Sequence, residues 1–113
     1  MAFPGFYNFF YYRGDTLQFV IRPKVANGSA FNLSGYTAAF TIANQRGSGA
    51  TQTAASATVN TATNLVTCTI TPAVGITLSP TTFVYDVQIT NGTQIYTILT
   101  GEVAVVDHVT GAV

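Results

Sequence analysis

Residues 82–100 (TFVYDVQITNGTQIYTILT) carry the clearest fold signal in the chain. Apolar residues alternate with polar ones on both sides of Asn91-Gly92, and this period of two predicts strands over 82–90 and 93–100. An Asn-Gly pair between two alternating segments is the strongest short-range signal of a β-hairpin and favours a two-residue type I′ turn. The stretch therefore predicts an antiparallel hairpin.

A two-residue turn would fix the register of this hairpin, because it pairs Thr90 with Thr93 and every residue behind them in turn. On the core face, the predicted pairs are Val87 with Tyr96 and Tyr85 with Ile98. On the other face, three apolar side chains would point away from the core: Val84, Ile95 and Leu99. Either another segment covers them, or they form a patch that contacts another chain.

The same alternation predicts further strands over 16–22, 36–43, 51–59, 65–71 and 102–107. Residues 72–80 lie between two prolines and predict a loop with at most one helical turn, anchored by Leu78. No helical stripe is visible elsewhere. About seven short strands with regular turn signals predict an all-β fold, a single antiparallel immunoglobulin-like β-sandwich, with a small barrel as the alternative.

Length and charge narrow the possible functions. A chain of 113 residues allows one domain, and we expect an aromatic arm over residues 1–12 and the sandwich over 13–113. Only 7% of residues are charged, and the formal net charge is +0. Nucleic-acid binding and polybasic membrane docking both need clustered Lys and Arg, so we expect neither. The single Cys excludes a disulfide within the chain.

The outstanding feature is the aromatic segment 2–12 (AFPGFYNFFYY). It has no basic residue before it and no small-residue cleavage site after it, so we do not expect a signal peptide. Such rings dominate interface energetics. The segment has three interpretations: an arm that docks on a partner subunit, a strand that seals its own core, or a platform for sugar rings. The predicted partner-binding residues are Phe3, Phe6, Tyr7, Phe9, Phe10, Tyr11, Val84, Ile95 and Leu99.

Catalytic chemistry has few candidates in this sequence. The one histidine is His108, and Cys68 falls on an inward strand face, where we expect a small buried hydrophobe. The four acids are spread along the chain, whereas glycoside hydrolysis needs two facing carboxylates. One His and one Cys do not build a zinc site. We therefore expect no catalytic residue, no metal and no cofactor.

Arg13-Gly14-Asp15 spells an integrin-binding tripeptide. That function needs the tripeptide on an exposed loop tip. We interpret it instead as a turn that enters the first predicted strand, because Gly14 can adopt the backbone angles of such a turn.

Short motifs accompany the predicted strands in a fixed order. They are Tyr12-Arg13-Gly14-Asp15-Thr16, Leu33-Ser34-Gly35-Tyr36 after the Asn27-Gly28 turn, Tyr85-Asp86-Val87-Gln88, Gly101-Glu102-Val103-Ala104-Val105 and Asp107-His108-Val109-Thr110. This order, over residues 12–110, resembles the small immunoglobulin-like modules of tailed-bacteriophage virion proteins, including the N-terminal modules of upper baseplate proteins. The resemblance implies a non-enzymatic role in building the particle and names no catalytic residues.

Longer members of this family carry a following domain, and a module alone fits a capsid decoration, or cement, protein. The resemblance thus implies a place on the virion surface, with the major capsid protein and further copies of the chain as partners. Two alternatives stay open. One is a tail, baseplate or fibre-attachment component that binds tail proteins, and the other is a carbohydrate-binding or adhesion module.

Overall fold

The computed structural model describes residues 5–25, 27–47, 49–107 and 109. Phe3 and His108 lie outside the described residues. The elements are β1 (Gly5–Phe6), β2 (Phe9–Tyr12), β3 (Leu17–Ile21), β4 (Thr37–Ala43), β5 (Gln52–Asn60), β6 (Leu65–Ile70), α1 (Pro72–Gly75), β7 (Thr82–Thr90) and β8 (Ile95–Val106).

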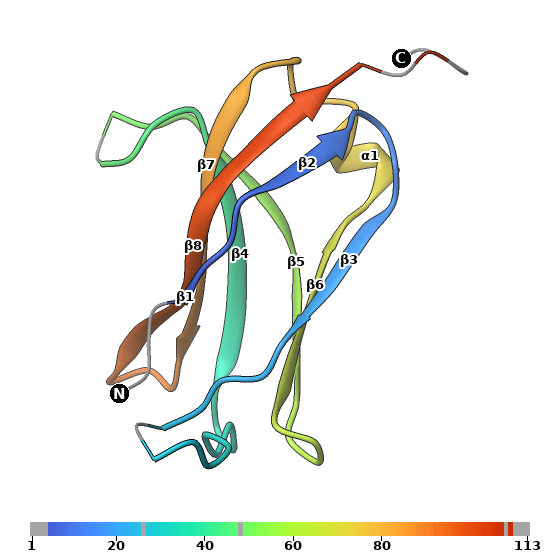
Figure 1. Cartoon of the computed structure of the whole chain (residues 1–113). Helices are drawn as coiled ribbons and strands as arrows, with labels where there is room; N and C mark the ends of the chain where they lie inside the picture. Colours follow the sequence, from blue (N-terminus) through green and yellow to red (C-terminus); the bar gives the residue numbers. More distant parts are fainter. Residues whose placement is uncertain (1–4, 26, 48, 108, 110–113) are drawn as a thin grey trace.

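Within the described residues, the strands form one curled sheet in the order β1-β8-β7-β4-β5-β6-β3, and β2 also pairs with β8 (Figure 1). The all-β prediction is confirmed. The expectation of a wholly antiparallel sheet is wrong, because β1 and β2 run parallel to β8. Alternation in a sequence predicts that a segment is a strand, but it carries no information on the direction of the neighbour.

Strand β5 connects the two halves of the sheet. Its first residues pair with β4 as far as Ala55, and the ladder with β6 begins at the next residue, Ser56. The alternating burial of β5 confirms the strand predicted over 51–59, which has the weakest alternation in the sequence. Because β5 takes part in both halves, it curls the sheet around a shared core (Figure 1).

Most of the core consists of inward strand residues that alternation predicts, and Tyr11, Leu33 and Leu78 complete it from outside those predicted strands. Its fully buried side chains are Tyr11, Leu33, Phe40, Ile42, Val66, Cys68, Ile70, Leu78, Tyr85, Val87, Ile89 and Val103. Edge-on rings fill its centre: Phe40 lies 5.6 Å from Tyr85 and 5.5 Å from Phe19, between ring centroids. Such pairs add to the free energy of area burial by about 0.5–1.5 kcal/mol each.

The register predicted from the Asn-Gly dipeptide is wrong. Thr90 pairs with Ile95 rather than with Thr93, and the Asn91 N–H donates to the Gln94 carbonyl at 3.2 Å. The turn therefore lies one residue further along the chain. The Asn91 side chain explains this shift, because its Oδ1 accepts hydrogen bonds from the backbone N–H groups of Thr93 (3.1 Å) and Gln94 (2.8 Å).

A bulge beyond the turn shifts the register again between Val87 and Gln88. Leu99 consequently pairs with Val87, whereas the two-residue turn would have placed it opposite Val84. Val84 pairs with Glu102 instead. The predicted pairs of Val87 with Tyr96 and Tyr85 with Ile98 are replaced by Ile89 with Tyr96 and Tyr85 with Gly101.

The chain between β2 and β3 contains Arg13-Gly14-Asp15, and it is a turn, as we interpreted it. Gly14 has a φ of 89°, and the Asp15 N–H donates to the Tyr12 carbonyl at 3.0 Å. The Arg13 guanidinium donates to the carbonyls of Ile76 (2.8 Å) and Leu78 (2.7 Å), in the segment that follows α1. Arg13 thus holds the segment after α1 against the β2–β3 turn. The prediction of one helical turn and a buried Leu78 in residues 72–80 is confirmed.

Candidate protein-binding surface

Along the aromatic segment, some rings point into the core and others point outward to the surface. Tyr11 is 1% exposed, and Phe9 is half-buried, with its ring 5.2 Å from that of Tyr85. Phe6 is 81% exposed and Phe10 is 75% exposed. The segment therefore seals its own core with one set of rings and presents another set to the outside.

A close approach between the segment and β8 fixes this arrangement. A Cβ at position 101 would overlap the carbonyl oxygen of Tyr7, so a glycine is required there. The Tyr7 N–H donates to the Thr100 carbonyl at 3.0 Å, and the Tyr85 hydroxyl donates to the Tyr7 carbonyl at 2.6 Å. The Glu102 N–H donates to Asn8 Oδ1 at 2.9 Å. Gly101 is thus an interior residue of one long strand, although the sequence predicts separate strands on either side of it.

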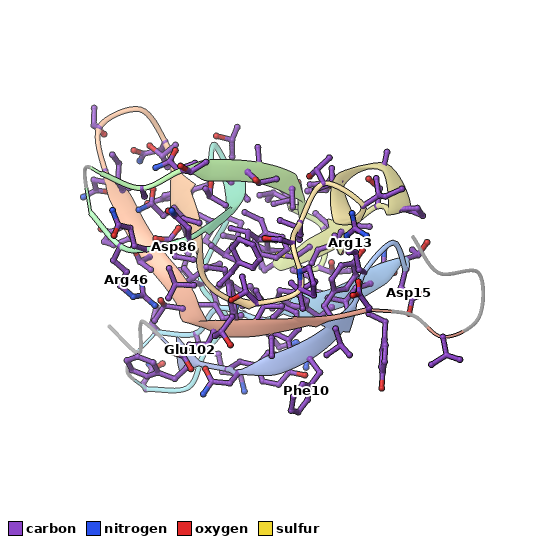
Figure 2. All side chains as sticks on the ribbon, turned by 90° about the horizontal axis from the view of Figure 1, so that it is seen from above. Phe10, Arg13, Asp15, Arg46, Asp86 and Glu102 are labelled. Atoms are coloured by element: carbon purple, nitrogen blue, oxygen red, sulfur yellow. The ribbon has the colours of Figure 1, made fainter. Side chains whose placement is uncertain are left out.

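The outward rings form what we call the aromatic strip: Phe6, Phe10 and Tyr12. In the parallel register, Phe10 lies beside Ala104 and Tyr12 beside Val106, which is also exposed. Figure 2 shows Phe10 pointing away from the body of the molecule. Exposed rings that follow one another along a sheet edge are typical of surfaces that bind another protein.

A groove of about 400 Å³ lies between this edge of the sheet and the opposite edge, β3. Its lining consists of Tyr7, Phe19, Val20, Ile21, Arg22 and Leu99. Val20 is exposed, whereas Phe19 packs against the core at 5.7 Å from the ring of Phe9. Mainly apolar side chains thus line a second outer surface close to the aromatic segment.

The three aliphatic residues predicted on the outer face of the hairpin do not form one patch. Ile95 is 67% exposed, as predicted, but it lies next to the turn. Leu99 is half-buried and packs against the core, and Val84 lines a polar pocket. Val84 and the partner of Ile95, Thr90, are six residues apart on β7, or about 20 Å at the usual strand rise. The shifted register explains this separation.

A polar pocket, which the sequence does not predict, lies between the β4–β5 loop and the outer face of the sheet. Its volume is about 280 Å³. Arg46 and Asp86 line it, and Figure 2 shows both at a distance from Phe10. The only signal in the sequence was the position of Asp86 among outward residues of an alternating strand.

The reactive groups of the core are held in their neutral forms. Burial raises the pKa of the Cys68 thiol to about 12 and raises the pKa of the Tyr85 hydroxyl as well. Within the described residues, no three His, Cys, Asp or Glu side chains are grouped as a metal site would require. No described helix is long and apolar enough to cross a membrane.

Comparisons with known proteins do not assign a family. No family model matches the chain, and no curated protein matches it. Among solved structures, the chain is similar to part of a family 123 glycoside hydrolase from Clostridium perfringens, with 13% identity and a TM-score of 0.41. The match covers 90% of this chain and 23% of the hydrolase.

Proposed function

We propose that this protein is a non-enzymatic structural component of a phage virion, a decoration protein that binds neighbouring capsid subunits. The observation that carries the proposal is the aromatic strip. Phe10 is held outward on β2, whose alternate rings Phe9 and Tyr11 face the core, and Phe6 is held outward on β1, which pairs with β8. A surface that is aromatic and built on a paired strand is preorganised, which lowers the entropic cost of binding.

The low charge of the chain supports a contact of this kind. Only 7% of residues are charged, so the interface needs little desolvation of ions, and its affinity depends weakly on salt. Repeated copies on a particle add avidity to each modest contact. The proposed mechanism is burial of the aromatic strip, with Ile95 and the groove beside β3 as further contact surfaces.

We also infer that the curled sheet is an immunoglobulin-like sandwich. Three features of the pairing support this topology: β8, β7 and β4 are neighbours, β3, β6 and β5 are neighbours, and the N-terminal strand runs parallel to the last one. This inference connects the fold with the phage modules that the motif order resembles. The proposed function depends on the aromatic strip rather than on this topology.

The first experiment asks whether the chain is part of a particle. Mass spectrometry of purified virions of the encoding phage should detect it at many copies per particle, and cryo-electron microscopy should place it on the head. Density on the tail would replace the decoration role by a tail or baseplate role. Absence from the virion would overturn the proposal.

The second experiment tests the surface. Particles lacking the protein are mixed with purified wild type, with a Phe6→Ser/Phe10→Ser variant, or with the control Ile76→Ser, which removes an exposed apolar side chain elsewhere. Losing a central aromatic contact costs about 2 kcal/mol, so binding by the double variant should fall at least about 30-fold. Equal binding by the double variant and the control would refute the role of the strip.

A further inference from the structure

We propose that the polar pocket beneath the β4–β5 loop binds a neutral saccharide. The pocket measures about 280 Å³, close to the lower end of the sizes at which proteins bind small molecules. It shares no lining residue with the aromatic strip. The inference is therefore independent of the proposed docking function, and the two can fail separately.

The floor of the pocket is the outer face of β4 and β7. In their antiparallel ladder, Thr41 pairs with Asp86, and Ala43 pairs with Val84. Positions two apart on a strand share a face, so these four side chains lie together. The floor is consequently half polar and half apolar, with the Ala43–Val84 pair as its apolar part.

The wall of the pocket is the β4–β5 loop, which its own hydrogen bonds shape. The Thr51 N–H donates to Asn44 Oδ1 at 2.8 Å, and the Asn44 N–H donates to the Thr51 carbonyl at 3.3 Å. Arg46 then extends from the loop towards β8, where its Nη2 donates to the Gly101 carbonyl at 3.4 Å. These contacts place the guanidinium at the border of the pocket.

The charged groups of the pocket do not satisfy each other. Asp86 is half-buried, and within the described residues its carboxylate accepts no hydrogen bond and forms no ion pair. Arg46 lines the same pocket without pairing with it. Its two carboxylate oxygens therefore remain available to accept hydrogen bonds from the donor groups of a ligand.

The composition of the lining selects the class of ligand. The lining holds one carboxylate and one guanidinium, so an anion or a cation would each meet a group of its own sign. Three amides, those of Gln45, Gln52 and Gln88, also line the pocket, and an amide can both donate and accept. The Gln88 Nε2 already donates to Thr97 Oγ1 at 3.4 Å, so its oxygen is the group left for a ligand. Saccharide hydroxyls likewise donate and accept, and neighbouring hydroxyls match the two oxygens of Asp86 or the paired N–H groups of Arg46. The C–H face of the ring would rest on the apolar floor.

The test is a titration followed by amide chemical shifts. The full chain, labelled with ¹⁵N, is titrated to tens of millimolar with glucose, galactose, mannose and N-acetylglucosamine, and separately with glycine as a zwitterionic probe. At least one sugar should shift the amides of residues 41–47 and 84–88. Asp86→Asn should weaken that sugar about tenfold or more, because hydrogen bonds to a charged group are lost.

Asp107→Asn is the matched control, since it makes the same aspartate-to-asparagine change at an exposed position after the end of β8, outside the pocket lining. This variant should bind the sugar like the wild type. The proposal is overturned if no sugar shifts the pocket amides, if glycine alone does so, or if Asp86→Asn and Asp107→Asn bind equally well.

Discussion

Replacing Gly101 by alanine tests the close approach that fixes the aromatic segment on β8. The new Cβ would overlap the Tyr7 carbonyl oxygen, so the segment must move away from the strand. Three hydrogen bonds cross at this point, namely Tyr7 N–H to Thr100 O (3.0 Å), Tyr85 hydroxyl to Tyr7 O (2.6 Å) and Glu102 N–H to Asn8 Oδ1 (2.9 Å). All three are expected to break or lengthen.

The magnitude follows from these bonds. Each contributes about 1 kcal/mol net, so their joint loss should lower the free energy of unfolding by about 3 kcal/mol. A domain of this size is typically stable by about 5–15 kcal/mol, so the variant should still fold. Release of the segment would also uncover Phe9, which normally packs against Tyr85.

Urea denaturation measures the stability change, and hydrogen exchange at the Tyr7 and Glu102 amides shows where it arises. Gly5→Ala is the control, because its Cβ would lie at an ordinary 3.5 Å from Leu99 Cδ1. That variant should match or slightly exceed the wild type, since alanine reduces the entropy of the unfolded chain. A Gly101→Ala protein within about 0.5 kcal/mol of wild type, with both amides still protected, would refute the reasoning.

Two further predictions concern buried groups. Tyr11→Phe removes the hydroxyl that donates to the Asp15 carbonyl at 2.7 Å, so the free energy of unfolding should fall by about 1 kcal/mol in urea denaturation, and an unchanged value would contradict this. Burial raises the pKa of the Cys68 thiol from 9.0 to about 12. The contribution of the neutral buried thiol to the free energy of unfolding is therefore complete below pH 9.0. It is lost between pH 9.0 and about pH 12, because the thiol ionises in the unfolded chain before it ionises in the folded one. Unfolding free energies across this range should fall by up to about 1.4 kcal/mol per pH unit from this group, and Cys68→Ala should show a shallower decline. Identical pH profiles for the two proteins would contradict the assignment.

Alternation predicted most of the fold because a half-buried strand must place polar and apolar residues on opposite faces. Alternation places Val87 and Cys68 on inward faces, and both are buried. The hairpin register failed because it depends on a side-chain hydrogen bond: the Asn91 carbonyl oxygen organises the turn, and a dipeptide rule does not include that contact.

The candidate surface was foreseen only in part. Residues 9–12 are all aromatic, so their hydrophobicity shows no alternation, and nothing in the sequence separates the inward Tyr11 from the outward Phe10. The parallel pairing with β8 supplies that distinction, and it depends on Gly101, far along the chain. The polar pocket depends on the β4–β5 loop extending towards β8, a contact between residues 46 and 101 that local patterns do not encode.

Strand β5 changes its hydrogen-bonding neighbour between two consecutive residues, Ala55 and Ser56. Along β5 no linker separates the two halves, and they share one core, so we expect them to unfold together and calorimetry to record a single cooperative transition. Force applied to one half of the sheet would likewise pass through the backbone of β5 to the other half. In the proposed decoration role, that continuity would let the chain carry tension between the subunits it binds.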